Sequence, residues 1–320
     1  MEIRQLAAMI AVAEAGTVTR AAELLRVVQP AVSRQIHALE KELNTVLFER
    51  TKNGMVLTDD GKVFLEYARR AMRELDRARA ELRPADSTLR GLVTIGLLPS
   101  VADPLADAVV ERVTAKHPAV RIRVTVGYGG HLAEWLDTAE VDLALLYDVA
   151  VKTRLATEPL VEEPLWLVGP SDCGLTEADP VDLHSRVGEP FVLPAPPHAL
   201  RSIVDHAAAR HGYELNVVAE TNAMSVQRRM AMRGIGLTVL PRTAVADELA
   251  AGKVAAAPLA GELLRRRLVL ALPTTRRLGP AVEAVADVLV AEVHQAIRQG
   301  RQGWWPLAKW IGRPPGEPRR

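Results

Sequence analysis

The chain has 320 residues, and its 40 basic and 39 acidic side chains leave a formal net charge of +1. This length exceeds one ordinary hydrophobic core, so we expect two or three modules. No apolar run approaches the roughly 18–20 residues that cross a bilayer, and the N-terminus enters an amphipathic helix without a signal-peptide core; we therefore expect a cytoplasmic protein with no membrane contact. A single cysteine, Cys173, excludes an intrachain disulfide and argues against a cysteine-ligated zinc site.

Two helical patterns joined by a short break occupy residues 17–43. Apolar side chains recur at i, i+4, i+7 and i+11 of the second pattern: Val32, Ile36, Leu39 and Leu43. The opposite face carries Pro30, Ser33, Arg34, His37 and Lys41. A helix with such a face can lie in the major groove of DNA and read base edges with its N-terminal turns. By periodicity alone, an ordinary surface helix with a solvated polar face remains the alternative.

The segment after these helices predicts a β-hairpin wing. Arg50-Thr-Lys-Asn-Gly54 lies between Phe48 and Val56, and the Asn-Gly pair is a strong turn signal. Arg50 and Lys52 would then lie against the DNA backbone or in the minor groove, whereas the alternative is a solvated loop. Residues 20–52 carry six basic side chains against four acidic ones, a local excess of two that can contribute to DNA binding when a dimer uses it twice.

A long helix is predicted from Thr58-Asp59-Asp60, which supply a cap and an acidic first turn, to about Leu82, before Pro84. Its apolar seam consists of Leu65, Ala68, Met72, Leu75 and Leu82 and is interrupted by Arg79. A narrow seam between charged side chains is typical of a dimerisation helix. The segment Pro84–Gly91 is interpreted as a hinge into the next domain.

Residues 92–300 alternate between strands and helices, which indicates a parallel α/β sheet. The predicted strands are Leu92–Leu97, Val120–Val126, Val141–Tyr147, Leu165–Val168, Phe191–Leu193, Val217–Thr221, Leu237–Leu240 and Leu268–Leu272. The predicted helices are Val101–His117, His131–Glu140, His198–His211, Met224–Arg233 and a last one from Pro280 to about Gln299. The return of the last strand and helix to the first part predicts two lobes with a double crossover.

A ligand site is expected where strand ends meet helix starts. Four such places converge, and the residues that we expect to bind the ligand are Pro99, Ser100, Gly129, Gly130, His131, Pro197, Arg201 and Thr221. Helix N-termini favour anions, and Arg201 could add a charge-assisted fork, so an organic acid or another anion is the expected ligand. Plain helix capping is the alternative for Ser100 and Thr221, and a surface or capping role is the alternative for His131 and His198.

No enzyme signature is present. The chain has no G-x-S-x-G elbow, P-loop or H-E-x-x-H motif, and Gly127-x-Gly129-Gly130 is too short for a dinucleotide fingerprint. The eight histidines form no i, i+4 metal pair. We therefore expect no catalytic residues, no cofactor and no metal.

The tail, residues 301–320, carries Trp304, Trp305 and Trp310 among basic residues and prolines. One interpretation is an extension that packs tryptophan rings on its own domain. The other is a contact with a protein partner or an anionic surface.

The residues between 21 and 61 resemble the DNA-binding domain of LysR-type transcriptional regulators. The similarity is carried by Ala21-Ala22-x-Leu24, Gln29-Pro30-Ala31-Val32-Ser33-x-Gln35-Ile36-x-x-Leu39-Glu40-x-x-Leu43, Leu47-Phe48-x-Arg50 and Leu57-Thr58-x-x-Gly61. It continues through Gly96-x-x-Pro99-Ser100, Val141-Asp142-Leu143-Ala144-Leu145, Gly234-Ile-Gly236 and Leu240-Pro241. The chain departs from the pattern at Thr17 (usually Ser), Val28 (often Ser or Thr), Asn44 (usually Gly) and Gly130 (often Ser or Thr).

The resemblance implies an α/β fold with an N-terminal winged helix-turn-helix, a long linker helix and a two-lobed α/β effector domain resembling periplasmic binding proteins. The expected domains are 1–58 (DNA binding), 59–90 (dimerisation helix and hinge), 91–300 (effector binding, with lobes of about 91–161 plus 267–300, and 162–266) and 301–320 (tail). The expected DNA contacts are Thr17, Thr19, Arg20, Gln29, Pro30, Ser33, Arg34, His37, Arg50 and Lys52.

The partners that the resemblance implies are double-stranded DNA, a small-molecule effector, further copies in a homodimer or homotetramer, and RNA polymerase if the protein is an activator. A lone cysteine argues against the peroxide-sensing branch of the family, whose switch uses two thiols. The alternative function is a small-molecule-binding protein without a DNA-regulatory role.

Overall fold

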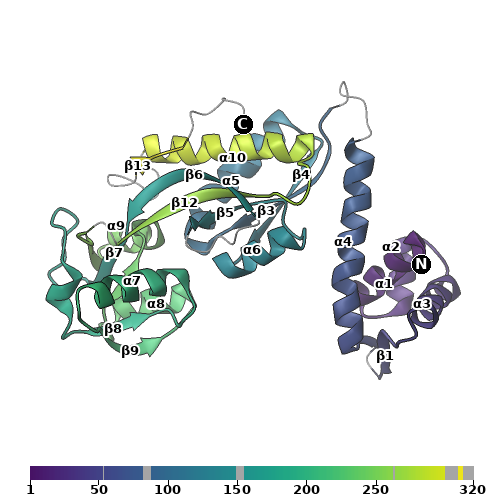
Figure 1. Ribbon diagram of the computed structural model, residues 1–320, viewed down its shortest axis with the longest axis horizontal. Helices are drawn as coiled ribbons and strands as arrows, with labels where there is room; N and C mark the ends of the chain where they lie inside the picture. The colour runs from purple at the N-terminus through teal and green to yellow at the C-terminus, as the bar shows by residue number, and fades with distance from the viewer. Residues whose placement is uncertain (53, 82–87, 149–154, 262–263, 300–308, 313–320) are drawn as a thin grey trace. The chain divides into compact units, whose positions relative to one another are not determined.

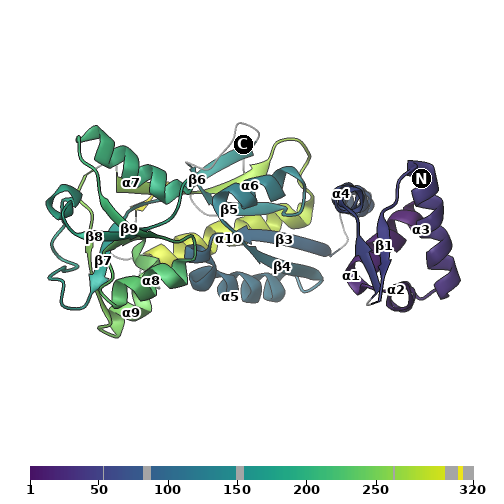
Figure 2. The same ribbon diagram turned by 90° about the horizontal axis from the view of Figure 1, so that it is seen from below.

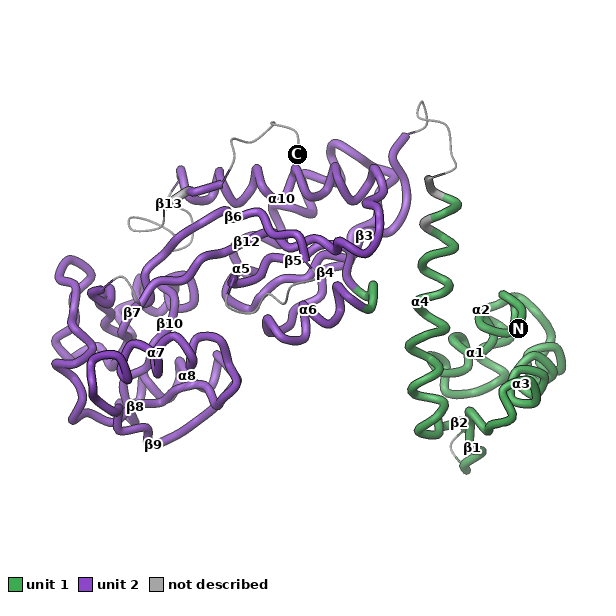
Figure 3. The backbone as a smooth tube through the Cα atoms, viewed as in Figure 1, with its two compact units in different colours: residues 1–87, 138–140 green, residues 88–137, 141–320 purple. Residues whose placement is uncertain are grey.

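The computed structural model describes all residues except 53, 82–87, 149–154, 262–263, 300–308 and 313–320. The chain divides into two compact units, one of Met1–Ser87 with Thr138–Glu140 and the other of Thr88–Asp137 with Val141–Arg320 (Figure 3). Within the described residues, no helix is long and apolar enough to cross a bilayer.

The first unit is a winged helix-turn-helix followed by a long helix. Its elements are α1 (Ile3–Ala15), α2 (Val18–Leu25), α3 (Gln29–Leu43), β1 (Phe48–Thr51), β2 (Gly54–Leu57) and α4 (Asp59–Glu81). The predicted apolar stripe of α3 is confirmed, since Val32, Ile36 and Leu39 are all buried in the core that α1, α2 and α3 share. Strands β1 and β2 form the antiparallel wing.

Local signals place the helix ends. Thr17 begins α2 by accepting a hydrogen bond from the Arg20 amide at 3.3 Å. Val28 precedes α3 without a side-chain cap, as expected from its lack of a hydroxyl. Asn44 ends α3 with φ 51°, the left-handed conformation that asparagine tolerates. Thr58 caps α4 as predicted, because its Oγ1 accepts from the Gly61 amide at 2.9 Å.

Part of the apolar seam of α4 packs within the first unit, whereas the prediction assigned the seam to a partner helix. Leu65 and Ala68 are buried in the core of the helix-turn-helix, and Met72 packs against the same core. Leu75 is 36% exposed and stays on the surface. The first half of the seam is therefore occupied within the unit, because the spacing that suits a partner helix equally suits a three-helix core. Leu82 and the first half of the predicted hinge, residues 84–87, lie outside the described residues.

The second unit begins with a lobe built on a six-stranded sheet of order β13-β6-β12-β5-β3-β4. Its strands are β3 (Gly91–Leu97), β4 (Val120–Val126), β5 (Leu143–Tyr147), β6 (Leu155–Pro164), β12 (Arg265–Pro273) and β13 (Lys309–Trp310). Helices α5 (Pro99–Lys116), α6 (Gly129–Asp137) and α10 (Pro280–Arg298) pack on it, with α10 and α6 on opposite sides of the sheet (Figure 1).

The prediction of a parallel sheet is confirmed for β3, β4 and β5 but is wrong for β12. Strand β3 is parallel to β4 and β5, whereas β12 is antiparallel to both β5 and β6. The reason is topological: β6 leaves for the second lobe and β12 returns from it, so the two strands run in opposite directions. Alternation of strands and helices does not reveal such a return.

The second lobe contains an antiparallel sheet of order β10-β7-β11 and a parallel pair, β8 and β9. Its elements are β7 (Trp166–Pro170), β8 (Pro190–Leu193), α7 (Ala199–Arg210), β9 (Asn216–Glu220), α8 (Met224–Met232), β10 (Thr238–Leu240), α9 (Ala246–Ala250) and β11 (Val254–Pro258). The sequence did not predict β6 or β11. Three consecutive alanines give β11 little strand signal.

Strands β6 and β12 connect the lobes side by side, as both views show (Figures 1 and 2). The short strand β13 pairs with the free edge of β6, and the Ile311 amide donates to the Leu160 carbonyl at 2.9 Å. Part of the tail therefore packs on its own unit through the backbone. Trp304 and Trp305 lie outside the described residues.

Candidate functional site

The surface of α3 opposite the core is open. Gln29, Pro30, Arg34 and His37 are exposed, and Ser33 is half-buried. Around them, Thr19, Arg20, Arg50 and Lys52 are exposed and Thr17 is half-buried. Arg20, Arg34, Arg50 and Lys52 form no ion pair with any described residue. The unit thus presents an exposed helix face beside four cations that have no ion pair with the described residues, an arrangement suited to contacts with phosphates and bases.

The wing is fixed to the end of α1. The Met55 amide donates to the Gly16 carbonyl at 2.8 Å. Gly54 has φ +133°, and a Cβ there would lie 2.3 Å from the same Gly16 oxygen. The glycine is therefore required by close approach of two backbones as well as by the turn. Asn53, the other half of the predicted turn signal, lies outside the described residues.

A pocket of about 470 Å³ lies between the two lobes of the second unit. Of the predicted ligand residues, Pro99, Ser100, Gly129, Gly130, His131 and Pro197 line it. Arg201 and Thr221 do not line it. The structure adds Tyr128, Tyr147, His198, Asn222, Gln227 and Arg266, together with an apolar wall. This size suits a small metabolite.

A buried polar chain runs behind one end of this pocket. Ser100 Oγ lies 3.1 Å from the Tyr147 hydroxyl, and the Arg266 guanidinium carbon lies 3.9 Å from the Tyr147 ring centre. Arg266 Nε donates to Glu163 Oε1 at 2.7 Å. Burial raises the pKa of the Tyr147 hydroxyl far above its usual range, although the Arg266 charge opposes that shift. The phenol therefore stays protonated and remains a possible donor.

The contact between Ser100 and Tyr147 argues against the capping alternative for Ser100. Helix α5 is preceded by Leu98 and has no side-chain cap, so the serine hydroxyl is not a capping group. It points instead to the partner on β5. The Ser100 amide, which follows Pro99, has no backbone acceptor among the described residues. Both groups of Ser100 therefore belong to the pocket end of the helix.

Two aromatic side chains meet in the pocket lining. Tyr128, from the first lobe, donates its hydroxyl proton to the Asn222 carbonyl of the second lobe. Its ring lies 5.4 Å from that of His198, edge to face. His198 also caps α7, since Nδ1 accepts from the Leu200 amide at 3.2 Å. Burial, together with the Arg266 charge, lowers the pKa of His198, so the ring is neutral near pH 7.

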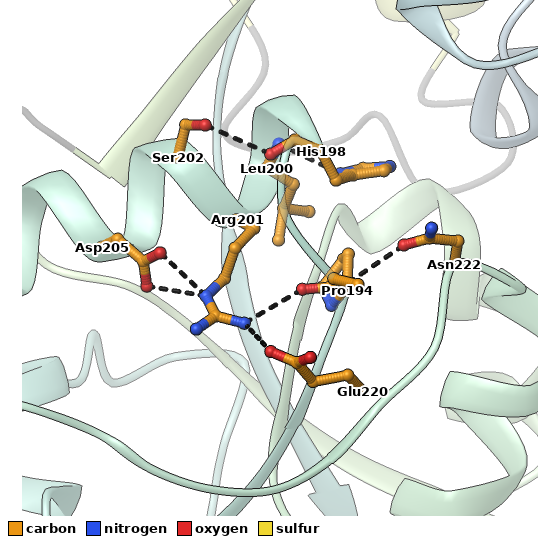
Figure 4. A network of polar contacts seen from close by, with 9 residues as sticks. Pro194, His198, Leu200, Arg201, Ser202, Asp205, Glu220 and Asn222 are labelled. Carbon is orange, nitrogen blue, oxygen red and sulfur yellow. Dashed lines mark hydrogen bonds and ion pairs between the residues drawn. The ribbon is translucent and has the colours of Figure 1, made fainter.

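Arg201 is committed elsewhere (Figure 4). Its Nε donates to both oxygens of Asp205 at 2.7 and 2.8 Å. Its Nη1 donates to the Pro194 carbonyl at 3.2 Å and to Glu220 at 2.5 Å. The expected fork toward a ligand is therefore replaced by contacts that hold the loop before α7, because carboxylates at i+4 and on β9 satisfy the guanidinium first.

Thr221 is a local turn residue, since its Oγ1 accepts from the Ala223 amide at 3.2 Å. The N-cap of α8 is Ala223, and that helix has no side-chain cap, so Thr221 closes a turn before the helix rather than capping it. Its neighbour Asn222 lines the pocket and accepts from the Ala195 amide at 3.0 Å.

The glycines of the loop before α6 have different roles. A Cβ on Gly127 would lie 2.6 Å from the Trp135 ring, so packing requires this glycine. A Cβ on Gly130 would meet open space. The amides of Gly129, Gly130 and His131 have no backbone acceptor among the described residues. They give the pocket a row of donors at a helix start.

Arg266 is the most important residue that the sequence did not reveal. It stands in the middle of Arg265-Arg-Arg267, which reads as a solvated basic run. Only the alternation of side chains along a strand distinguishes Arg266 from its two neighbours. In β12 its side chain points inward, and the residue is 6% exposed. The described residues contain no cluster of side chains suited to a metal ion.

Comparison with known proteins identifies the chain. The family model "LysR substrate binding domain" matches residues 86–294, and the model "Bacterial regulatory helix-turn-helix protein, lysR family" matches residues 3–62. The chain belongs to the LysR family. It is a LysR-type transcriptional regulator with a DNA-binding domain and an effector-binding domain.

Relatives over nearly the whole chain are also transcriptional regulators rather than enzymes. This LysR-type regulator is 29% identical over 308 residues to the nitrogen assimilation regulatory protein nac of Escherichia coli (strain K12), which covers 96% of this chain and 99% of that protein. It is 30% identical over 302 residues to the transcriptional regulator CfxR of Cupriavidus necator, which covers 94% of both chains.

Solved structures share the fold. A full-length OxyR variant from Pseudomonas aeruginosa has a TM-score of 0.69 at 22% identity and covers 92% of this chain and 95% of that one. Full-length CbnR complexed with its target DNA has a TM-score of 0.66 at 22% identity and covers 92% of this chain and 100% of that one.

Proposed function

We propose that this LysR-type regulator reads promoter DNA with α3 and holds the DNA backbone with the wing. In this proposal Ser33, Arg34 and His37 face the bases. Arg50 and Lys52 neutralise phosphates, while Thr17, Thr19, Arg20, Gln29 and Pro30 flank the groove. The observation that carries the proposal is the exposed basic face of α3, whose cations have no carboxylate partner among the described residues.

We also propose that the pocket between the lobes binds a small anionic effector and that binding alters promoter occupancy. Arg266, the Ser100 end of α5 and the amide row of α6 all favour negative charge. A ligand changes regulation only if it binds two assembly states with different affinity. Strands β6 and β12 join the lobes and carry Glu163 and Arg266. A ligand at Arg266 therefore acts on the strands that connect the lobes, which is how it would favour one assembly state over another.

The assembly that we propose is a homodimer paired through α4, with two dimers forming a homotetramer. Leu75 and the exposed Val63 and Tyr67 are the apolar groups of α4 that stay on the surface. RNA polymerase is the further partner if the protein acts as an activator.

Footprinting of the purified protein on its own promoter region tests the proposal. We expect two protected half-sites with sequence preference and an affinity that falls steeply with salt. Repeating the footprint with an effector should change the spacing or extent of protection. Binding without sequence preference would overturn the proposed reading by α3.

A further inference from the structure

Three exposed apolar side chains lie at the N-terminal end of α3. Leu24 lies near the end of α2, Val27 lies in the turn, and Val28 directly precedes α3 and is 67% exposed. A single exposed apolar residue is ordinary on a protein surface, but this group adjoins Gln29 and Pro30 on the open face of α3. The group is therefore continuous with the surface that we propose contacts DNA.

The backbone around Val28 is fixed on both sides. Arg26 ends α2 in the left-handed conformation with φ 55°, and the Val27 amide donates to the Ala22 carbonyl at 3.0 Å. The Val28 carbonyl accepts from the Ala31 amide at 2.9 Å. A β-branched side chain is also stiff about χ1. Val28 is thus held in a defined position, so a contact through it would cost little conformational entropy.

The side chain of Val28 can make only apolar contacts, and it does not cap α3. A phosphate placed against it would lose hydration without gaining a hydrogen bond. The edges of the base pairs in the major groove carry hydrogen-bond donors and acceptors, but they carry one apolar group, the 5-methyl group of thymine. The chemistry of Val28 therefore matches thymine alone among the four bases.

The position of Val28 on the helix separates its contact from that of Arg34. Val28 precedes Arg34 by six residues, which is about 9 Å along a helix that rises about 1.5 Å per residue. Successive base pairs are about 3.4 Å apart. In a helix that lies along the groove, the two side chains therefore meet base pairs that are about two or three steps apart.

We propose that Val28 packs against the 5-methyl group of one thymine in each operator half-site and is a specificity-determining residue of this regulator. The chain departs here from the family pattern, in which Ser or Thr is common, so the contact is a property of this chain. The inference rests on the proposed reading of DNA by α3 and adds to it a base contact without a hydrogen bond.

The test replaces each thymine of the operator in turn with uracil, which differs from thymine only by lacking the 5-methyl group. The full-length protein is used with the operator that footprinting identifies. We expect binding to weaken by about fourfold at one position of each half-site, because that factor corresponds to the burial of one methyl group. Equal affinity for the thymine operator and every uracil operator overturns the inference.

Val28→Ala assigns the contact to this residue. The variant should fold like the wild type, because the Val28 side chain is exposed and makes no capping hydrogen bond. It should bind the thymine and uracil operators with equal affinity. Val46→Ala is the matched control, since Val46 is a valine of the same unit that is 59% exposed but follows the C-terminal end of α3, and it should keep the difference. A Val28→Ala protein that still distinguishes thymine from uracil overturns the role of Val28.

The same operators separate this inference from the proposed function when Arg34→Ala is measured beside Val28→Ala. If Arg34→Ala relaxes the sequence preference but uracil has no effect at any position, α3 reads DNA and the inference fails. If the wild type binds all sequences alike and uracil has no effect, both fail. If Val28→Ala alone abolishes the difference between thymine and uracil, the inference stands and the role of Arg34 fails.

Discussion

Replacing Gly54 with alanine should detach the wing from the helix-turn-helix. Gly54 has φ +133°, and the new Cβ would lie 2.3 Å from the Gly16 carbonyl oxygen. That oxygen accepts the Met55 amide at 2.8 Å, so the clash falls on the bond that anchors the wing. The wing must therefore move, and Arg50 and Lys52 move with it.

Two contributions set the magnitude. A residue other than glycine in this backbone region costs about 1–3 kcal/mol. Loss of the Met55 hydrogen bond costs about 0.5–1.5 kcal/mol more. The expected decrease in the free energy of unfolding is therefore about 1.5–4.5 kcal/mol, a large share of the roughly 5–15 kcal/mol of a typical domain.

Gly16→Ala is the matched control. Gly16 has φ +71°, but a Cβ there would meet no atom within 4 Å, so the change adds only the left-handed strain of about 1–2 kcal/mol. Urea denaturation of both variants, followed by DNA binding at several salt concentrations, measures the difference. Gly54→Ala should be the less stable variant and should show a shallower salt dependence. Equal stability and equal salt dependence in the two variants would refute the reasoning.

Two further predictions concern single side chains. Glu40→Gln should destabilise the DNA-binding unit by about 1–2 kcal/mol. Glu40 Oε1 accepts hydrogen bonds from the Leu47 amide at 2.9 Å and the Phe48 amide at 3.3 Å, and these bonds join α3 to the wing. An unchanged midpoint of urea denaturation would contradict this prediction. Burial and the Arg266 charge hold the pKa of His198 below its ordinary value of 6.5, so on acidification the unfolded chain binds a proton before the folded protein does. The stability that the neutral ring contributes is therefore complete above pH 6.5. It is lost as the pH falls through the pKa of His198 in the folded protein. His198→Gln should therefore flatten the loss of stability on acidification, and a slope equal to that of the wild type would show that His198 does not contribute.

The sequence was sufficient where a pattern is local. The stripe of Val32, Ile36 and Leu39 predicts its own burial because helical periodicity fixes which face meets the core. The Pro99–Ser100 start of α5 is likewise a local signal, and the pocket lies there. Both depend only on neighbouring residues.

The sequence was insufficient where a role depends on partners far along the chain. The sequence singles out Arg201 because it stands at the start of a helix, whereas Arg266 is hidden in a run of three arginines. Glu220 and Asp205 occupy the first, while β12 carries the second into the pocket wall. The antiparallel return of β12 and the shared use of Leu65 by the helix-turn-helix core are also non-local. Periodicity reports that a face is apolar, but not which surface covers it.

The central claim, that α3 reads DNA sequence, is tested most directly by competition binding of Arg34→Ala against a library of operator variants. Arg121→Ala, an exposed arginine of the second unit that forms no ion pair with any described residue, is the control. We expect Arg34→Ala to lose about 1–3 kcal/mol on the best operator and to relax preference at one base position of each half-site, with the control unchanged. Retention of both affinity and sequence preference by Arg34→Ala would contradict the claim.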